Sequence, residues 1–285
     1  MVSVLGIVVV SYRSDDATVT FVRNELSKIS VPKEIVVVDN GADEAEAALL
    51  QERIPEAKVL RAENLGYARG NNLGVEWLLS HNSPEYILIC NNDIEIEGDG
   101  VVETLMDKAV NHQEAAAFGP AVVGPAGDYQ SPEPYMGLWK RYVWMYLSTP
   151  FLSAERKRRC FHLDYAGQAQ EGLHYRLSGS FFLLRTSDFV DAGMFDPRTF
   201  LYGEECILSE RLARIGKGCY YCPEVKVIHR HGTTIRRHYT DTASSMMQFE
   251  SMAYYYAAYK GISSFETGCV RALYRFILRL RQWRT

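Results

Sequence analysis

The feature that most constrains the fold is a short apolar run, residues 87–90, that ends abruptly in polar side chains. Its sequence is Ile-Leu-Ile-Cys, and Asn91, Asn92 and Asp93 follow it directly. An uncharged run of this length is typical of a buried strand in a parallel sheet. Ligands of open α/β sheets bind just beyond the carboxyl ends of such strands. We therefore expect Asp93 to lie at a ligand site.

Similar runs occur three more times in the first part of the chain, and helical segments separate them. Residues 4–10, 34–38 and 58–60 have the composition of strands. Amphipathic segments beginning near Asp15 and near Asp43 are predicted to be helices, because acidic residues favour helix starts. Strands that alternate with helices at this pace predict βαβ units, and hence an α/β fold with a mostly parallel sheet flanked by helices.

The polar residues after the run at 87–90 suggest a metal site. The carboxylate of Asp93 and an amide oxygen from Asn91, two residues earlier, are hard oxygen donors of the kind that Mg²⁺ or Mn²⁺ prefers. The alternative is a turn aspartate that caps a helix beginning near Asp99. The short motif taken alone fits both interpretations.

A glycine-rich segment, residues 64–74, lies between the third run and the run at 87–90. Small residues allow the backbone to approach a ligand closely, and a helix N-terminus beside an arginine favours phosphate. The alternative is a tight connection from strand to helix with an amide at the N-cap. The candidate ligand-binding residues in this segment are Asn64, Gly66, Arg69, Asn71 and Asn72.

Two neighbouring acids, Glu204 and Glu205, open a helical segment in the second half of the chain. Acids are common in the first helical turn because they interact favourably with the helix dipole, and this is the simplest explanation of the pair. Adjacent side chains on a helix point about 100° apart, so only one of the two can address a given substrate atom.

An alternating run, residues 220–228, predicts a later strand that ends in His229. His231 follows two residues along and points to the same side while strand geometry persists, so either histidine could face a site at this edge. Cys219 and Cys222 have the spacing of a metal or redox pair. Because residues three apart on a strand point to opposite faces, we interpret both as structural thiols.

The composition narrows the class of protein. The chain has 285 residues, a formal net charge of −4 and six cysteines without framework spacing, which favours a reducing cytoplasm. No apolar run reaches the roughly 20 residues that a spanning helix needs, so we do not expect an integral membrane protein.

Basic and aromatic residues alternate over residues 135–162, after a predicted loop at 120–135. No nucleic-acid-binding motif accompanies them, so we expect no nucleic-acid partner. We expect this segment to be an acceptor-side flap, a membrane-facing segment or a solvated helix pair. Two helices, separated near Gly261, are predicted to form a C-terminal tail over 236–285. The apolar stripe of the second helix, residues 270–283, is flanked by arginines, and it fits either contact with an anionic membrane or packing on the domain.

Four segments in the first half resemble, in order and spacing, the nucleotide-sugar half of family-2 glycosyltransferases with the GT-A fold, in particular the rhamnosyltransferase-like branch. They are Val8-Val-Val-Ser-Tyr12, Val38-Asp39-Asn40, residues 64–74 and Leu88-Ile-Cys-Asn-Asn-Asp93. The segment from Gly193 to Gly216 resembles the acceptor-side signature of the same family. The resemblance implies a GT-A domain over residues 1–235, with a nucleotide-sugar half at 1–118 and an acceptor half at 119–235.

The same resemblance implies an activity and a set of roles. The activity is inverting transfer of a sugar from a UDP- or dTDP-sugar to a hydroxyl of a cell-surface glycan or lipid-linked saccharide. Glu205 takes the place of the catalytic base and Glu204 supports it, while Asp93, Asn91 and His229 take the place of the ligands of Mn²⁺ or Mg²⁺. The nucleotide-sugar residues are Ser11, Tyr12, Asp39, Asn64, Gly66, Arg69, Asn71, Asn72 and Asn92. This sequence departs from the family pattern at two positions where the family often has an aspartate. Asn91 stands at one of them and Ile207 at the other.

Two other functions fit part of the pattern. A metal-dependent nucleotidyltransferase also needs a metal and a nucleotide pocket, but it would need a basic cluster after the first strand, where Arg13 is the sole arginine between residues 11 and 14. A catalytically silent nucleotide-sugar-binding subunit would bind donor without transfer, whatever residue stands at position 205.

Overall fold

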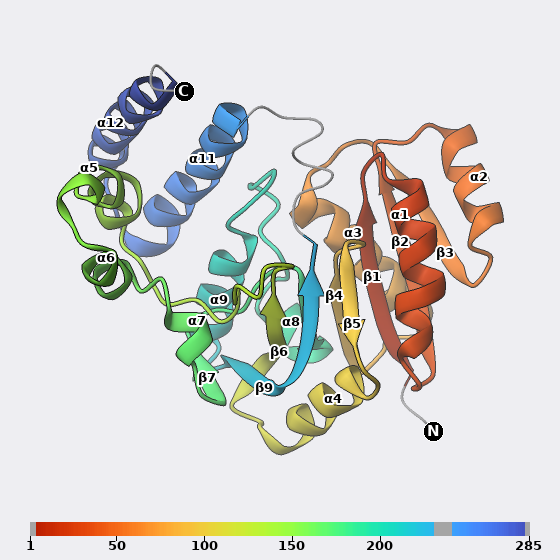
Figure 1. The fold of residues 1–285 in the computed structure, drawn as a ribbon. Helices are drawn as coiled ribbons and strands as arrows, with labels where there is room; N and C mark the ends of the chain where they lie inside the picture. Colours follow the sequence, from red (N-terminus) through yellow and green to blue (C-terminus); the bar gives the residue numbers. More distant parts are fainter. Residues whose placement is uncertain (1–3, 231–240, 283–285) are drawn as a thin grey trace.

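A nine-stranded sheet runs through the centre of the computed structural model, which describes residues 4–230 and 241–282 (Figure 1). The strand order is β3-β2-β1-β4-β8-β6-β9-β5, with β7 paired to β9. The strands are β1 (Leu5–Ser11), β2 (Lys33–Asn40), β3 (Ala57–Ala62), β4 (Tyr86–Cys90), β5 (Ile94–Glu97), β6 (Ala115–Val123), β7 (Gly172–His174), β8 (Phe181–Arg185) and β9 (Gly218–His229).

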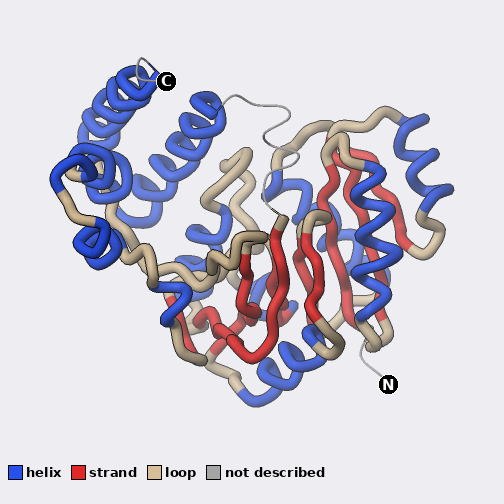
Figure 2. The backbone as a smooth tube through the Cα atoms, in the orientation of Figure 1, coloured by secondary structure: helices blue, strands red, loops and turns tan. Residues whose placement is uncertain are grey.

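Helices flank this sheet and extend beyond it at the C-terminal end (Figure 2). They include α1 (Asp15–Thr20), which continues as a π-helical turn η1 (Phe21–Glu25), α2 (Glu44–Arg53), α3 (Tyr67–His81), α4 (Val101–Asn111), η3 (Lys140–Trp144), α5 (Met145–Leu147), α6 (Ala154–Phe161), α7 (Tyr165–Gln168), α8 (Thr186–Asp191), α9 (Glu204–Arg214), α11 (Asp241–Lys260) and α12 (Ser264–Gln282).

The predicted parallel sheet is present in the first half of the chain. Strands β3, β2, β1 and β4 are parallel, and their register pairs Ser11 with Asp39 and Val9 with Cys90. The carboxyl ends of β1, β2 and β4 therefore meet at one edge. The second half is mixed, because β8 is antiparallel to both neighbours, while β5 and β7 are antiparallel to β9.

The loop predicted at 120–135 is wrong for residues 120–123, which belong to a strand. Strand β6 includes Pro120 and ends at Val123, and its pairing with β9 shifts register between Pro120 and Ala121. Proline has no backbone N–H to donate, so an irregularity at this point lets the strand continue past it. Two short strands, β5 and β7, had no prediction at all.

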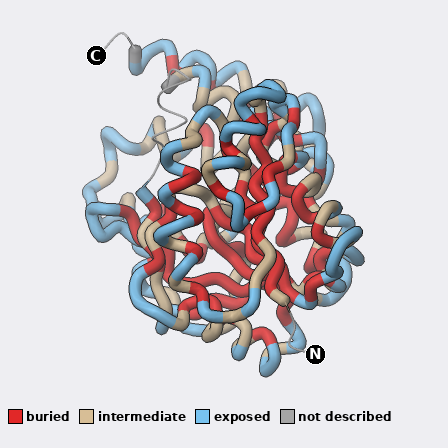
Figure 3. The backbone as a smooth tube through the Cα atoms, turned by 90° about the vertical axis from the view of Figure 1, so that its right-hand side faces the viewer, coloured by how far each residue is buried: buried red, intermediate tan, exposed pale blue. Residues whose placement is uncertain are grey.

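Two hydrophobic clusters fill the two faces of the sheet, and the strands between them are buried (Figure 3). Helices α1, α2 and α4 contribute to one cluster, and α3, α8 and α9 contribute to the other. Cys222 belongs to the first cluster and Cys219 to the second, so the two thiols point to opposite faces as predicted.

The C-terminal helices form a third cluster with η3 and α9. Helix α12 buries Val270, Tyr274, Ile277 and Leu278 and leaves Phe276 exposed. Part of the predicted stripe, including Val270 and Ile277, therefore packs on the protein as one of the two interpretations expected, whereas Phe276 does not. Trp283, the last residue of that predicted stripe, and His231 lie outside the described residues. No helix in the described part of the chain is long and apolar enough to span a membrane.

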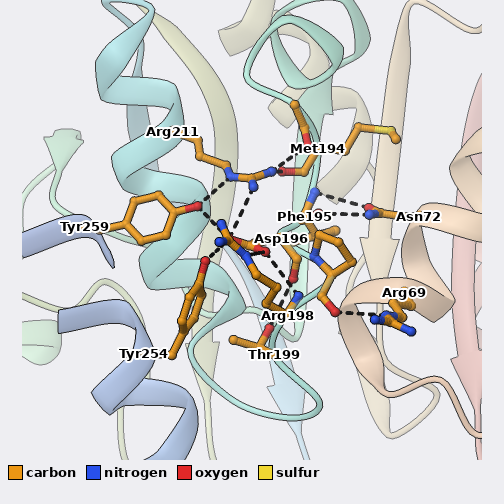
Figure 4. A network of polar contacts seen from close by, with 12 residues as sticks. Arg69, Asn72, Met194, Phe195, Asp196, Arg198, Thr199, Arg211, Tyr254 and Tyr259 are labelled. Atoms are coloured by element: carbon orange, nitrogen blue, oxygen red, sulfur yellow. Dashed lines mark hydrogen bonds and ion pairs between the residues drawn. The ribbon is translucent and has the colours of Figure 1, made fainter. Parts of the chain in front are cut away.

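A polar network fixes α11 to the sheet domain (Figure 4). Asp196, 1% exposed, accepts hydrogen bonds from Arg198 and from the hydroxyls of Tyr254 and Tyr259, and Arg211 lies 3.3 Å away. The C-terminal helices are thus joined to the loop that precedes α9.

Candidate active site

A cavity of about 1020 Å³ opens at the carboxyl ends of β1, β2 and β4. The strand ends form one wall. Residues 129–146, residues 161–166 and the start of α9 supply most of the remainder, and Ser244, Ser245 and Gln248 of α11 close it. The polar ends of strands far apart in sequence therefore face the same space as the acidic pair.

Asp93 and His229 lie together at this cavity. His229 ends β9, whose neighbour β5 begins at Ile94, and Nε2 of His229 is 3.2 Å from Oδ1 of Asp93. That buried carboxylate oxygen has no hydrogen-bond partner within residues 4–230 and 241–282, although the imidazole is close. Nδ1 of His229 lies 3.0 Å from Oε1 of Gln130, a residue that the sequence analysis did not single out.

The oxygen of the Asn91 amide is also near the cavity, but it has a partner within the protein. It accepts a 3.0 Å hydrogen bond from the hydroxyl of Tyr67, which lies 2.8 Å from the carbonyl of Gly179 as well. Asp93, His229 and Asn91 thus lie at one edge. No cluster of three or more His, Cys, Asp or Glu that could hold a metal ion occurs within residues 4–230 and 241–282.

Ser11 and Asn92 shape the cavity wall through contacts within the protein. Asn92 donates hydrogen bonds of 2.8 Å to the hydroxyls of Ser14 and Thr18. The buried hydroxyl of Ser11 lies 2.8 Å from that of Thr18, so these four side chains join the ends of β1 and β4 to α1. Asn92 and Ser14 line the cavity, whereas Ser11 lies behind it.

Asp39, the second-to-last residue of β2, is 2% exposed, and its buried Oδ2 has no hydrogen-bond partner among the described residues. Burial, with the charges of Asp15 and Glu46, raises the pKa of Asp39 to about 6. Tyr12 lines the cavity, and its ring packs on Gly41, where a Cβ would come within 2.9 Å of the ring. Asp39 itself is not among the lining residues; it lies behind the wall, where the register pairs it with Ser11, the residue before Tyr12.

Asn40, which carried no prediction, holds the segment that contains Asn64 and Gly66. Its amide accepts from the N–H of Leu65 and donates to the carbonyl of Gly66. Asn64 and Gly66 line the cavity as expected. Gly66 has φ +82°, and a Cβ there would lie 2.2 Å from the carbonyl oxygen of Phe200, so this position needs glycine.

Three of the predicted ligand-binding residues do not line the cavity: Arg69, Asn71 and Asn72. Helix α3 begins at Tyr67, so all three are within the helix rather than in the loop before it. Arg69 donates to the carbonyl of Pro197, and the Asn72 amide forms two hydrogen bonds with the backbone of Phe195. Asn71 is buried and donates to the carbonyl of Tyr67. These contacts fix α3 to the loop before α9.

Glu205 faces the cavity with its carboxylate held by a buried arginine. Nη1 of Arg176 is 2.6 Å from Oε1 of Glu205, and the same guanidinium pairs with Glu133. Glu204 is 3% exposed, and its Oε1 has no hydrogen-bond partner. Burial and the charge of Glu205 raise the pKa of Glu204 above its usual range. The two acids therefore occupy different environments.

The structure also contains site residues that the sequence did not reveal, among them Asn40, Tyr67, Gln130 and Arg176. Asn40 follows Asp39 at a strand end, and that position was a usable signal. Gln130 and Arg176 come from loops, where no periodicity marks them, and their partners are 99 and 29 residues away in the sequence.

Comparison with known proteins agrees with this arrangement. The model of the glycosyl transferase family 2 matches residues 7–188, more than half of the chain. This chain belongs to that family. The glycosyltransferase is 27% identical over 288 residues to N-acetylglucosaminyl-diphospho-decaprenol L-rhamnosyltransferase of Mycobacterium tuberculosis, an alignment that covers 98% of this chain and 90% of the relative.

Solved structures share the fold of this glycosyltransferase at low sequence identity. S. aureus TarS 1–349 in complex with UDP-GlcNAc has a TM-score of 0.56 at 14% identity, covering 96% of this chain and 71% of that one. GalNAc-T7 with UDP, GalNAc and Mn²⁺ has a TM-score of 0.54 at 13% identity, covering 81% of this chain and 44% of that one. The predicted GT-A-like α/β fold is thereby confirmed.

Proposed function

We propose that this glycosyltransferase moves a sugar from a UDP- or dTDP-sugar to a hydroxyl of a lipid-linked saccharide, with inversion at the anomeric carbon. The observation that carries the proposal is that Asp93 and Glu205 line one cavity, although they lie in different halves of the chain. Asp93 would hold a divalent cation at the leaving diphosphate. Glu205 would be the base that accepts the proton of the attacking hydroxyl.

The residues at the strand ends suit a nucleoside diphosphate. The unpartnered Oδ2 of Asp39 would accept a hydrogen bond from the N3–H of a pyrimidine, and Tyr12 would pack on its ring. Burial makes such a bond valuable, because an unsatisfied carboxylate oxygen is costly in the interior. The UDP-GlcNAc bound to the structural neighbour TarS agrees with this choice of donor.

The donor set at Asp93 fits a divalent cation such as Mn²⁺ or Mg²⁺. A buried carboxylate oxygen with no hydrogen-bond partner beside an imidazole nitrogen is a ligand pair suited to Mn²⁺, and the donor diphosphate would complete the coordination. A cation bound there would neutralise charge on the leaving diphosphate. Asn91 would stay a weaker contributor, because its oxygen already accepts from Tyr67.

Glu205 would accept the proton of the acceptor hydroxyl as that oxygen attacks the anomeric carbon. Arg176 holds its carboxylate at the cavity wall, so the base is oriented before the acceptor binds. Glu204, buried next to it with a raised pKa, would support the acceptor site rather than take the proton.

The acceptor class rests on the name of the curated relative, which acts on a diphospho-decaprenol saccharide. We propose contact with an anionic membrane at the cytoplasmic face, where such an acceptor would be reached. Exposed apolar side chains of α12 lie beside arginines on the same helix and support this contact.

A donor screen tests the proposed function directly. The full chain is incubated with UDP- and dTDP-sugars, with and without Mn²⁺, and released nucleoside diphosphate is measured together with a short-chain lipid-diphosphate N-acetylglucosamine acceptor. We expect acceptor-dependent release of UDP or dTDP. Release of pyrophosphate from a nucleoside triphosphate would instead indicate a nucleotidyltransferase. Donor binding without release of nucleoside diphosphate from any donor would indicate a silent subunit.

A further inference from the structure

The cavity holds a cationic side chain that the proposed chemistry does not use. Arg141, on η3, is the single lysine or arginine among the described residues that line the cavity. Its guanidinium makes no ion pair or hydrogen bond with any other described residue. By contrast, Arg176, from the neighbouring loop, pairs with two carboxylates. Arg141 is therefore available to an anion.

Tyr142 supplies a second unused polar group beside Arg141. The residue is 2% exposed, and its ring packs edge-on against Phe249 and Tyr274, at centroid distances of 4.9 and 5.0 Å. The residue lines the cavity, and its buried hydroxyl has no hydrogen-bond partner in the described structure. Buried hydroxyls normally have a partner, so an unpartnered hydroxyl on a residue that lines a cavity is a candidate ligand-binding group.

The cavity lies at the upper end of the size range of ligand sites. Sites for drug-sized ligands are roughly 300 to 1,000 Å³, and this cavity is about 1020 Å³. The donor residues come from β1, β2 and β4, whereas Arg141 and Tyr142 come from the segment that follows β6. Of the glutamates that line the cavity, Glu133 and Glu205 are paired with Arg176, whereas Glu204 is 3% exposed.

An apolar path leads outward from these two residues. Met145 and Tyr146 line the cavity just after them, and Trp144 and Leu147, on the same stretch of helix, are 57% and 47% exposed. Phe151 follows at 85% exposed. A ligand that carries an anionic group at one end and a hydrocarbon chain at the other would match this sequence of environments.

We propose that Arg141 and the hydroxyl of Tyr142 bind the phosphate groups of a lipid-linked acceptor, with its hydrocarbon chain passing over Met145 and Tyr146 toward the exposed Trp144. This inference rests on the proposed function for the acceptor class. It adds the residues that recognise the acceptor phosphate, and they are separate from the residues for the donor diphosphate.

Equilibrium binding tests the proposal without requiring transfer. Geranyl diphosphate is titrated by calorimetry into the full chain with UDP and Mn²⁺ present. A hydrogen bond to a charged group corresponds to about 10- to 100-fold in affinity. We expect Arg141→Gln to weaken binding by at least about tenfold and Tyr142→Phe by a few fold, whereas the matched control Lys140→Gln, whose side chain does not line the cavity, changes it less than about twofold.

Two further titrations separate the sources of the anion. Inorganic pyrophosphate should bind more weakly than geranyl diphosphate, because it lacks the chain, and equal binding would show a site for free phosphate instead. UDP affinity should be the same in wild type and Arg141→Gln. A tenfold loss of UDP affinity would assign Arg141 to the donor diphosphate and overturn the proposal, as would absence of geranyl diphosphate binding at millimolar concentration.

The test of this anion site can fail or succeed independently of the test of sugar transfer. Should Arg141→Gln fail to fold, which a thermal melt would reveal, Tyr142→Phe keeps the ring packing and carries the test alone. Transfer to the lipid acceptor without geranyl diphosphate binding would remove this site and leave the enzyme assignment standing. Binding without transfer from any donor would keep the anion site and remove the proposed reaction.

Discussion

The hydroxyl of Tyr259, near the end of α11, donates a 2.7 Å hydrogen bond to Oδ2 of Asp196, which lies in the loop before α9. Tyr254, one turn earlier, donates to the same oxygen at 2.7 Å. The acceptor-side loop and the C-terminal helices are therefore one structural unit. The segment 236–285, predicted to be a tail, is therefore tied to this loop, and removing the segment would disturb the loop before α9.

Asp196→Ala should destabilise the protein by about 3–5 kcal/mol, because it leaves a network of buried donors and Arg211 without their acceptor. Urea unfolding followed by fluorescence measures this. The control is Asp191→Ala, an exposed acid on the nearby helix α8. A loss of less than about 1 kcal/mol would show that the network contributes little.

The Asp196 network also predicts an acid dependence of stability. Burial alone would raise the pKa of Asp196, but hydrogen bonds from Arg198, Tyr254 and Tyr259 outweigh it and hold this pKa well below its usual range. A depressed folded-state pKa gives stability that is present above the unfolded value, near about 4, and is lost as pH falls below it. Asp196→Asn should flatten this dependence between pH 5 and 3.

Asp93→Ala should abolish the Mn²⁺ dependence of nucleotide binding while leaving the fold intact, because it removes the sole carboxylate of the proposed metal site. Calorimetric titration of UDP or dTDP with and without Mn²⁺ measures the effect. Asp99→Ala, an exposed acid in the following loop, is the control. Metal-dependent affinity that survives in Asp93→Ala would exclude this residue from the site, whereas loss in His229→Ala as well would place the imidazole beside the metal.

Glu205→Gln should lower kcat by about 10²- to 10⁴-fold with little change in donor affinity, since the amide keeps the size of the side chain but accepts no proton. Glu204→Gln is the matched variant, because the two acids adjoin and only Glu205 is held by Arg176. We expect the smaller effect at Glu204. A much larger loss of kcat in Glu204→Gln would reverse the roles assigned to the pair.

Asp39 should make donor binding sensitive to pH near 6. Its pKa is raised to about 6 in the free protein, mainly by burial. A pyrimidine N3–H favours the ionised carboxylate, so UDP binding should release a proton below that pH, and affinity should rise toward pH 7 and then level off. The effect on stability has the opposite sign. Because the pKa of Asp39 is higher in the folded state than in the unfolded state, its contribution to the free energy of unfolding decreases as the pH rises from about 4 to about 6. Affinities measured from pH 5 to 8 check this, and Asp39→Asn should bind UDP more weakly with no such rise.

The sequence predicted the parallel half of the fold because each strand there is a continuous apolar run. The run at 87–90 is buried on both faces and ends at the cavity. The mixed half was harder, since β6 contains a proline and β5 spans only four residues. Local pattern cannot reveal that β9 pairs with β5, β6 and β7, because those pairings join segments more than 40 residues apart.

The site residues divide in the same way. Positions at strand ends, such as Asp93 and Tyr12, were identifiable because topology alone brings strand ends together. Arg69 and Asn72 were expected near phosphate, but the helix begins two residues before Arg69, and their side chains turn toward the loop at 195–197. Which face of a helix a side chain occupies depends on where the helix starts, and glycine-rich sequence does not fix that point.

The last prediction concerns the exposed face of α12. Phe265, Phe276 and Leu280 are 81%, 59% and 50% exposed, and they recur at spacings of 11 and four residues, which place them on one side of the helix. Arg271 and Arg275 are partly exposed, and each forms an ion pair with Glu250. The exposed Arg279 lies one residue before Leu280. Such a face can insert among lipid headgroups while its arginines meet anionic lipids.

Deleting α12 would uncover Val270 and Tyr274, so surface substitutions are the sharper test of this face. Phe276→Ser with Leu280→Ser should reduce sedimentation with vesicles that contain anionic phospholipid by several fold, while the melting temperature changes little. Val110→Ser, which alters an equally exposed residue on α4, is the control. Binding should also weaken as salt is raised from 50 to 500 mM, because the distance over which exposed charges are screened falls from about 14 Å to about 4 Å. Sedimentation that is the same for both variants and wild type, or a full chain that does not bind vesicles at low salt, would show that α12 serves packing alone.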